Sequence, residues 1–167
     1  MVKILIIYDS RSGNTEKMAT AVAEGAKQIK ATEVFIKKVG EASLKDLQEA
    51  DGIIIGSPTY YGSMSGKLKV FIDESVKLHG KLKGKVGAAF TSSGGAATGA
   101  ETTLLSILQA LLIHGMVVQG RHDDKHYGAA SVSAPQAKEI ESCKNLGKRV
   151  ATLAARLKKR SSGPGRI

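Results

Sequence analysis

The sequence VKILIIYDSRSGNT, residues 2–15, contains an apolar run that is followed directly by a turn of small polar residues. Val2 to Tyr8 predicts a buried strand, because nearly continuous apolar residues are typical of parallel strands covered on both faces. Thr15 to Ile29 predicts a helix, since Met18 and Val22 recur at helical spacing on one side. This strand, turn and helix form the first unit of the predicted fold.

The turn between strand and helix predicts an anion-binding site. It consists of Ser10, Arg11, Ser12, Gly13, Asn14 and Thr15. Such a turn leaves backbone N–H groups free at the N-terminus of a helix, where the helix dipole also favours negative charge. The hydroxyl groups of Ser10, Ser12 and Thr15 add further donors. We predict that the anion is a phosphate and that other loops hold the group attached to it.

The alternation of strand and helix continues along the chain. Further strands are predicted at residues 33–38, 52–56, 86–91 and 116–118. Five strands alternating with five helices predict an α/β fold, a five-stranded parallel sheet with helices on both faces. We expect one domain at residues 1–160 and a flexible tail at 161–167.

Two more loops of glycine and hydroxyl residues, 57–66 and 92–99, follow the third and fourth predicted strands. Because the carboxyl ends of parallel strands share one edge, all three loops are expected to meet there. Aromatic residues make up only 4% of the chain, yet Tyr60, Tyr61 and Tyr127 fall in predicted loops. Aromatic side chains in loops favour a planar ligand over core packing.

Composition and charge set wider bounds. The formal net charge is +10, and eight basic residues without an acid lie between Lys144 and Ile167. This segment is either a solvated helix face or a surface that attracts nucleic acid or an anionic cofactor. The nucleic-acid alternative lacks the aromatic residues that usually alternate with basic ones in such surfaces. One cysteine excludes an internal disulfide, and no apolar run is long enough to span a membrane, so we expect a cytoplasmic protein.

The sequence lacks the motifs of several other classes of enzyme and nucleotide-binding protein. The dinucleotide fingerprint GxGxxG and the hydrolase motif GxSxG are both absent, and residues 62–67 are one residue short of a nucleotide-triphosphate P-loop. His122 and His126, with two aspartates between them, would suit a metal only on a helix, and flanking glycines favour a loop. We therefore predict no metal site, and we interpret Cys143 as a core thiol.

Several stretches resemble a known family. Residues 10–15 resemble the flavodoxin phosphate loop, and residues 56–62 resemble the loop that lies along the flavin ring. Residues 91–95, 101–105, 114–117 and 127–128 are similar to the WrbA-like branch, the NAD(P)H:quinone oxidoreductases. The resemblance implies a flavodoxin-like strand order, 2-1-3-4-5, and bound FMN.

The resemblance also assigns roles to the loops. The phosphate would lie at residues 10–15, and the ring would be held between the two other loops. The ring loop would use Pro58, Thr59, Tyr60, Tyr61 and Gly62, with either tyrosine stacking on the flavin. The ribityl chain and ring edge would be enclosed by Thr91, Ser92, Ser93, Gly94 and Gly95. His114 and Tyr127 match family residues near the flavin, although His114 is equally interpreted as a cap of its own helix.

The implied activity is transfer of electron pairs from diffusible NAD(P)H to a quinone or another small acceptor through FMN. Flavin chemistry needs no catalytic acid–base pair, which agrees with the absence of one from the sequence. The family also implies a homo-oligomer, either a dimer or a tetramer. Two alternatives stay open: a flavodoxin-type electron carrier without its own substrate, and a basic protein associated with nucleic acid.

Overall fold

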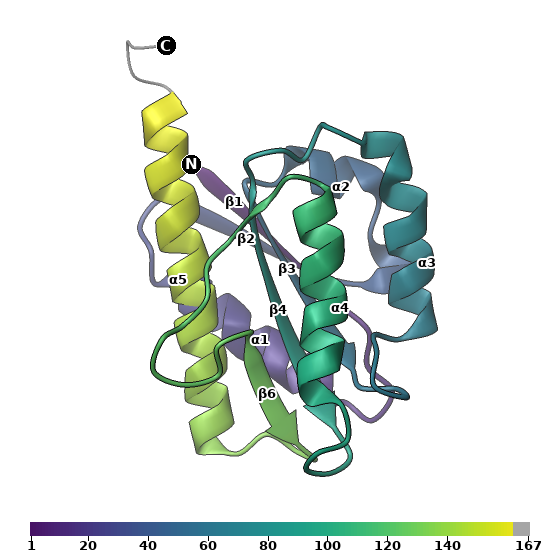
Figure 1. The fold of residues 1–167 in the computed structure, drawn as a ribbon. Coiled ribbons are helices and arrows are strands. Elements are labelled where there is room, and N and C mark those ends of the chain that lie inside the picture. The colour runs from purple at the N-terminus through teal and green to yellow at the C-terminus, as the bar shows by residue number, and fades with distance from the viewer. Residues whose placement is uncertain (162–167) are drawn as a thin grey trace.

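The chain folds around a parallel sheet whose strand order is β2-β1-β3-β4-β5 (Figure 1). The computed structural model describes residues 1–161. The strands are β1 Val2–Tyr8, β2 Thr32–Lys38, β3 Gly52–Pro58, β4 Val86–Ser93, β5 Val117–Val118 and β6 Ala129–Val132. The predicted fold class and strand order are confirmed.

The sheet has one strand more than the sequence predicted. Both β5 and β6 pair with β4 in parallel, β5 at its beginning (Val86 opposite Val117) and β6 at its end (Phe90 opposite Ala129). The fifth position of the sheet is therefore shared by two short strands, separated by residues 119–128. The sequence alone predicts a loop at residues 120–134, because the four residues of β6 carry too little periodicity to mark a strand.

Helices cover both faces of the sheet, as predicted. They are α1 Asn14–Lys27, α2 Leu44–Glu49, α3 Gly66–Glu74, α4 Ala100–Ile113 and α5 Ala137–Ser161, with short 3₁₀ turns at Val39–Glu41 (η1) and Ser75–Leu78 (η2). Figure 1 shows α1 and α5 on one side and α3 and α4 on the other. Apart from Ser161, which ends α5, the expected tail lies outside the described residues.

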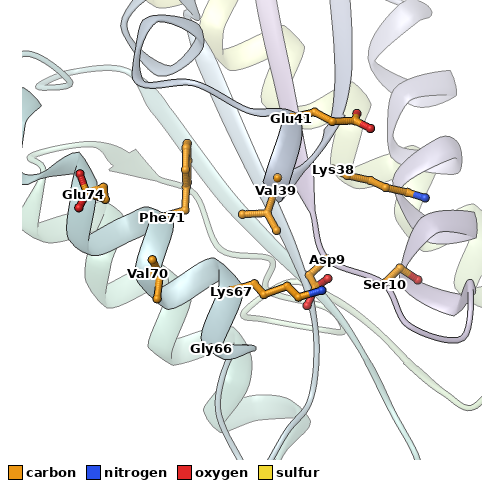
Figure 2. A pocket seen from close by; sticks show the side chains of 11 residues that line it. Asp9, Ser10, Lys38, Val39, Glu41, Gly66, Lys67, Val70, Phe71 and Glu74 are labelled. Atoms are coloured by element: carbon orange, nitrogen blue, oxygen red, sulfur yellow. The ribbon is translucent and has the colours of Figure 1, made fainter.

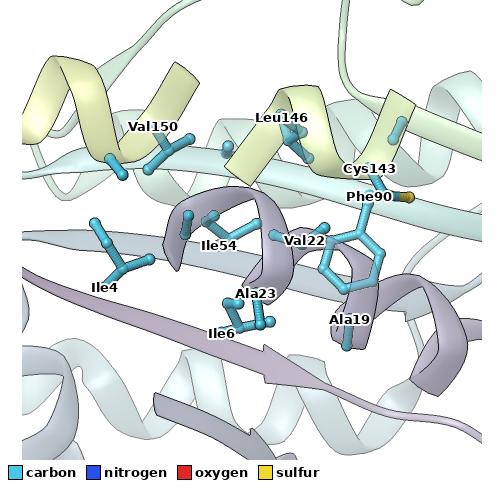
Figure 3. Packing of buried hydrophobic residues seen from close by; sticks show 14 of the residues in the cluster. Ile4, Ile6, Ala19, Val22, Ala23, Ile54, Phe90, Cys143, Leu146 and Val150 are labelled. Atoms are coloured by element: carbon cyan, nitrogen blue, oxygen red, sulfur yellow. The ribbon is translucent and has the colours of Figure 1, made fainter. Parts of the chain in front are cut away.

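A separate hydrophobic cluster fills each side of the sheet. Under α1 and α5, Val22, Ile54 and Phe90 are completely buried (Figure 3). Cys143 belongs to the same cluster, and its burial raises the pKa of its thiol to about 12. The interpretation of this cysteine as a core thiol is therefore confirmed.

Local sequence explains some helix starts and not others. At α2, the Ser43 hydroxyl accepts from the backbone N–H of Asp46, and the Asp46 carboxylate accepts from the backbone N–H of Ser43. These reciprocal bonds form a capping box, which ends the chain's approach to α2 at Ser43. The spacing of Thr98 and Glu101 also predicts a capping box before α4, and this prediction is wrong: α4 is preceded by Gly99 at φ +98°, and Thr98 donates to the Gly95 carbonyl.

Two glycines allow α1 and α5 to touch through their backbones. A Cβ on Gly25 would lie 1.9 Å from the carbonyl oxygen of Lys144, and a Cβ on Gly147 would lie 1.9 Å from that of Val22. No side chain fits at either position. The helix that begins at the predicted anion site is thus held in place by close contact with α5.

Replacing Gly147 by alanine tests this contact. We expect Gly147→Ala to lower the free energy of unfolding by about 3 kcal/mol, because the added methyl group must separate the two backbones. Gly66→Ala is the matched control: no atom lies within 4 Å of its Cβ position at the start of α3. It should raise stability by about 0.5–1 kcal/mol through reduced backbone entropy of the unfolded chain.

Urea unfolding followed by circular dichroism measures both changes. Equal stability of the Gly147→Ala variant and the wild-type chain would contradict the proposed helix contact.

Candidate functional site

The three predicted loops meet at one edge of the sheet. Tyr8 at the end of β1 lies opposite Gly56 of β3, and Pro58 at the end of β3 lies opposite Ser92 of β4. The strands therefore end at similar heights, and the loops that follow them start side by side. The expected common edge is confirmed.

Hydrogen bonds tie these loops to one another. The backbone N–H of Thr59 donates to the Ser92 carbonyl at 2.8 Å, and the Thr91 hydroxyl donates to the Ser57 carbonyl at 2.7 Å. The hydroxyl oxygens of Thr15 and Ser92 lie 2.9 Å apart and are buried, which connects the first loop to the third. These bonds fix the relative positions of the loops before any ligand binds.

The turn after β1 keeps donors available. Its Ser10 hydroxyl accepts from the backbone N–H groups of Gly13 (3.1 Å) and Glu16 (3.3 Å), which folds the turn over the start of α1. Gly13 has φ +88°, and its Cβ position opens onto empty space. The backbone N–H groups of Ser12 and Asn14 have no hydrogen-bond acceptor among the described residues. A small anion fits this set of donors.

The two tyrosines of the second loop have different environments. Tyr60 and Ser63 exchange two backbone hydrogen bonds of 3.0 Å, and Tyr61 and Gly62 occupy the positive-φ positions between them (φ +48° and +73°). In this tight turn Tyr60 lines the space between the loops, whereas Tyr61 is fully exposed. Of the two tyrosines, Tyr60 therefore lines the cleft and Tyr61 does not, a distinction that the sequence left open.

The start of α4 supports this turn. A Cβ on Gly99 would lie 2.5 Å from the Cα of Gly62, which leaves no room for a side chain. Gly99 also has φ +98°, a backbone conformation that strains any other residue. The backbone at the start of α4 therefore packs directly against this turn. Gly99 is thus a positioning residue for Tyr60 that the sequence reading missed.

A cleft of about 430 Å³ lies between the three loops. Its volume is within the usual range for small-ligand sites, roughly 300–1,000 Å³. It is lined by Arg11, Ser12, Asn14, Thr15, Pro58, Thr59, Tyr60, Ser92, Ser93, Gly94 and Ser133. Most of the predicted site residues are therefore brought together around a single opening.

Other predicted residues lie near the cleft without lining it. Thr91 is completely buried and bonded to Ser57, so it supports the loops from beneath. The Gly95 carbonyl accepts from the hydroxyls of Ser93 and Thr98, which closes the third loop. Thr91 and Gly95 thus shape the site by hydrogen bonds that hold the loops, without lining the cleft themselves.

His114 does not reach the cleft within this chain, so its expected flavin contact in the same chain is wrong. It ends α4 at the opposite, amino-terminal edge, where Gly115 accepts a hydrogen bond from Gly84 just before β4. Its Nε2 lies 2.7 Å from the Ser75 hydroxyl, and burial lowers the pKa of the ring. His114 is the residue at which α4 ends, and its ring bonds to Ser75 of η2 rather than to a carbonyl of α4.

Tyr127 is also displaced from its expected place, because it precedes β6 rather than following it. Ala129, two residues later, pairs with Phe90, whereas β4 continues to Ser93. Tyr127 therefore lies away from the carboxyl-terminal edge of the sheet, where the cleft opens. Ser133, which follows β6, lines the cleft instead and donates its backbone N–H to the Ser93 carbonyl at 2.7 Å. Sequence reasoning missed Ser133 because it missed the strand that carries it.

The loop before Tyr127 uses its polar groups internally. Arg121 pairs with Asp123, and the Nδ1 atom of His126 lies 2.9 Å from the Arg121 carbonyl. Across residues 1–161, no three His, Cys, Asp or Glu side chains gather in a way that suits a metal ion. Within the same range, no helix has the length and apolar character to cross a membrane.

A larger cleft, about 940 Å³, opens beside Ser10 on the β2 side (Figure 2). Its floor includes Val39, Val70 and Phe71, and its rim carries lysines together with the carboxylates of Asp9, Glu41 and Glu74. Three carboxylates disfavour a phosphate, whereas the smaller cleft offers N–H and hydroxyl donors and no acid. The smaller cleft is therefore the better candidate for the predicted anion.

Comparisons with known proteins agree with this geometry. The family model described as NADPH-dependent FMN reductase matches residues 2–123. A flavodoxin from Aquifex aeolicus is 44% identical over 163 residues, covering 93% of this chain and 88% of the relative. An NAD(P)H dehydrogenase (quinone) from Archaeoglobus fulgidus is 40% identical over 191 residues, covering 94% and 100% of the two chains.

A solved structure has the same fold. It is that of a flavodoxin, WrbA-like protein from Agrobacterium tumefaciens, with a TM-score of 0.82 and 29% identity. The match covers 93% of this chain and 99% of the other. The relatives therefore include proteins named flavodoxin and proteins named NAD(P)H dehydrogenase (quinone).

Proposed function

The chain belongs to the NADPH-dependent FMN reductase family of flavodoxin-like proteins, and on that premise we propose that it binds FMN and transfers electrons from NAD(P)H to a quinone. The observation that carries the proposal is the cleft of about 430 Å³ between three bonded loops. Each part of the cleft has chemistry that fits one part of FMN.

The turn at residues 10–15 fits the phosphate. Backbone N–H groups of Ser12 and Asn14 have no partner in the described structure, and both residues line the cleft. They lie at the N-terminus of α1, where the helix dipole favours an anion. Arg11 is exposed at the same rim and adds a positive charge.

The second and third loops fit a flat ring. Tyr60 lines the cleft with its side chain partly exposed, which leaves an aromatic face free for stacking. Gly94 of the third loop also lines the cleft and has no atom within 4 Å of its Cβ position, so the backbone there is open to close approach. Thr59, Ser92 and Ser93 also line the cleft, and their hydroxyl groups bond to other residues of the loops and so hold the walls in place.

Bound FMN would supply hydride acceptance and donation, chemistry that no side chain offers. The chain's own part is to hold and orient the ring and to stabilise charge on it. Arg11 is the charged residue among those lining the cleft, and no carboxylate is among them. A negatively charged reduced ring is therefore not repelled, which supports electron transfer in pairs.

One observation favours the flavodoxin-type electron carrier as a second candidate. The alignment with the Archaeoglobus quinone dehydrogenase spans 191 residues, more than the 167 of this chain, so that relative has segments without a counterpart here. The Aquifex flavodoxin aligns over 163 residues. Without these segments, which lie inside the alignment, the chain has fewer elements with which to enclose a quinone. We further propose that the chain forms a dimer or a tetramer.

Exchanging each tyrosine for serine tests the assigned ring wall. Tyr60→Ser should weaken FMN binding by about tenfold, since it removes an aromatic stacking surface. Tyr61→Ser is the matched control, because this neighbouring ring is fully exposed, and its affinity should change by less than about twofold. Flavin fluorescence quenching measures both affinities. A larger loss in the Tyr61 variant would reverse the assignment.

Steady-state turnover separates the two candidate functions. With saturating FMN, NADPH and benzoquinone, a reductase should oxidise NADPH at about 1 s⁻¹ or faster, the ordinary range for enzymes. Free FMN at the same concentration gives the background rate. A protein that holds one FMN per chain yet does not exceed this background would be an electron carrier, and the reductase proposal would fail.

A further inference from the structure

The amino-terminal edge of the sheet, opposite the FMN cleft, carries a second concave site. Its cavity of about 490 Å³ lies between the turn that precedes β4 and the last turns of α5. It is lined by Asp51, Lys81, Lys83, Gly84, Lys85, Val86, Ala154, Leu157 and Lys158. Four lysines and one aspartate give this lining a net charge of +3. Segments distant in the sequence thus build one basic pocket, which we call the amino-edge pocket.

The turn that carries three of these lysines has a fixed backbone. Leu82 is only 1% exposed and anchors the turn in the core under α3 and α4. Gly80 and Gly84 both have φ +79°, and the Gly84 N–H donates to the Gly115 carbonyl at 2.9 Å. The lysines on either side of Leu82 therefore project from a rigid support rather than from a mobile loop.

Two of the four ammonium groups are already oriented. Lys85 Nζ donates to the carbonyl of Gln48 at 2.9 Å and to that of Ala50. Lys158 Nζ donates to Asp51 at 2.7 Å and to the Met1 carbonyl at 2.8 Å. Holding these side chains in place reduces the entropy that a ligand would otherwise remove on binding.

The pocket lacks a full set of counter-charges. Asp51 is already engaged, since its Oδ2 atom accepts from both Lys158 Nζ and the backbone N–H of Lys3. No ion pair or hydrogen bond joins the side chain of Lys81 or Lys83 to any described residue. Burial lowers the pKa of Lys85; the attraction of Asp51 opposes this shift, and the repulsion of Lys158 adds to it. Like charges gathered in this way destabilise the folded chain unless an anion binds.

We propose that the amino-edge pocket binds a compact polyphosphate anion, at a site separate from the FMN cleft. Lysine binds phosphate as a point charge, and several lysines around one cavity suit an anion that carries several charges. The remaining lining, which includes Val86, Ala154 and Leu157, contains no aromatic side chain on which a base could stack. The pocket thus recognises the phosphate chain rather than a nucleotide base.

Calorimetric titration with inorganic tripolyphosphate tests the proposal. The full chain is used with saturating FMN, so that the turn at residues 10–15 does not compete for the probe. We expect saturable binding of one tripolyphosphate per chain, weakened about tenfold in the double variant Lys81→Gln/Lys83→Gln, which loses two charge contacts. Raising the salt concentration should weaken binding to the wild-type chain.

The double variant Lys138→Gln/Lys148→Gln is the matched control. It removes the same charge from two exposed lysines of α5 that do not line the pocket, and it should change the affinity by less than about twofold. Equal weakening in both double variants, or no saturable binding to the wild-type chain, would overturn the proposal. Binding of a DNA duplex through Lys81 and Lys83, with none of tripolyphosphate, would also overturn it.

Discussion

The parallel register of β1, β3 and β4 is the constraint on which the site depends. It places Tyr8 opposite Gly56 and Pro58 opposite Ser92, so three loops leave the sheet at nearly the same height. A slip of one residue would turn each buried side chain to the other face, which the two hydrophobic clusters forbid. The core therefore sets where the loops begin, and hydrogen bonds such as that between Thr59 and Ser92 fix the loops relative to one another.

Helix packing far from the cleft has an equally direct effect on it. The N–H donors of the phosphate turn belong to the beginning of α1, and α1 is held by α5 where Gly25 and Gly147 bring the two backbones together. On the other face, the contact of Gly99 with Gly62 holds the turn that carries Tyr60. The phosphate turn and the turn that carries Tyr60 thus both depend on glycines at positions where a side chain would not fit.

Much of this could be predicted from the sequence, because buried parallel strands and glycine-rich turns leave strong local signals. Residues 2–8 and 10–15 were assigned from apolar continuity and turn composition alone. What failed depended on tertiary context: β6 has only four small residues, so both it and the cleft residue Ser133 were missed. His114 was placed by resemblance, whereas the length of α4 carries it to the opposite edge.

The central claim is that the three loops hold a flavin by its phosphate, and a comparison of FMN with riboflavin tests it most directly. Riboflavin has the same ring without the phosphate, so it loses the charge-assisted hydrogen bonds of the turn at residues 10–15. Titration of flavin-free protein, followed by fluorescence quenching, should show one FMN per chain and riboflavin binding at least about 100-fold weaker. Equal affinities, or no saturable binding of FMN, would contradict this account.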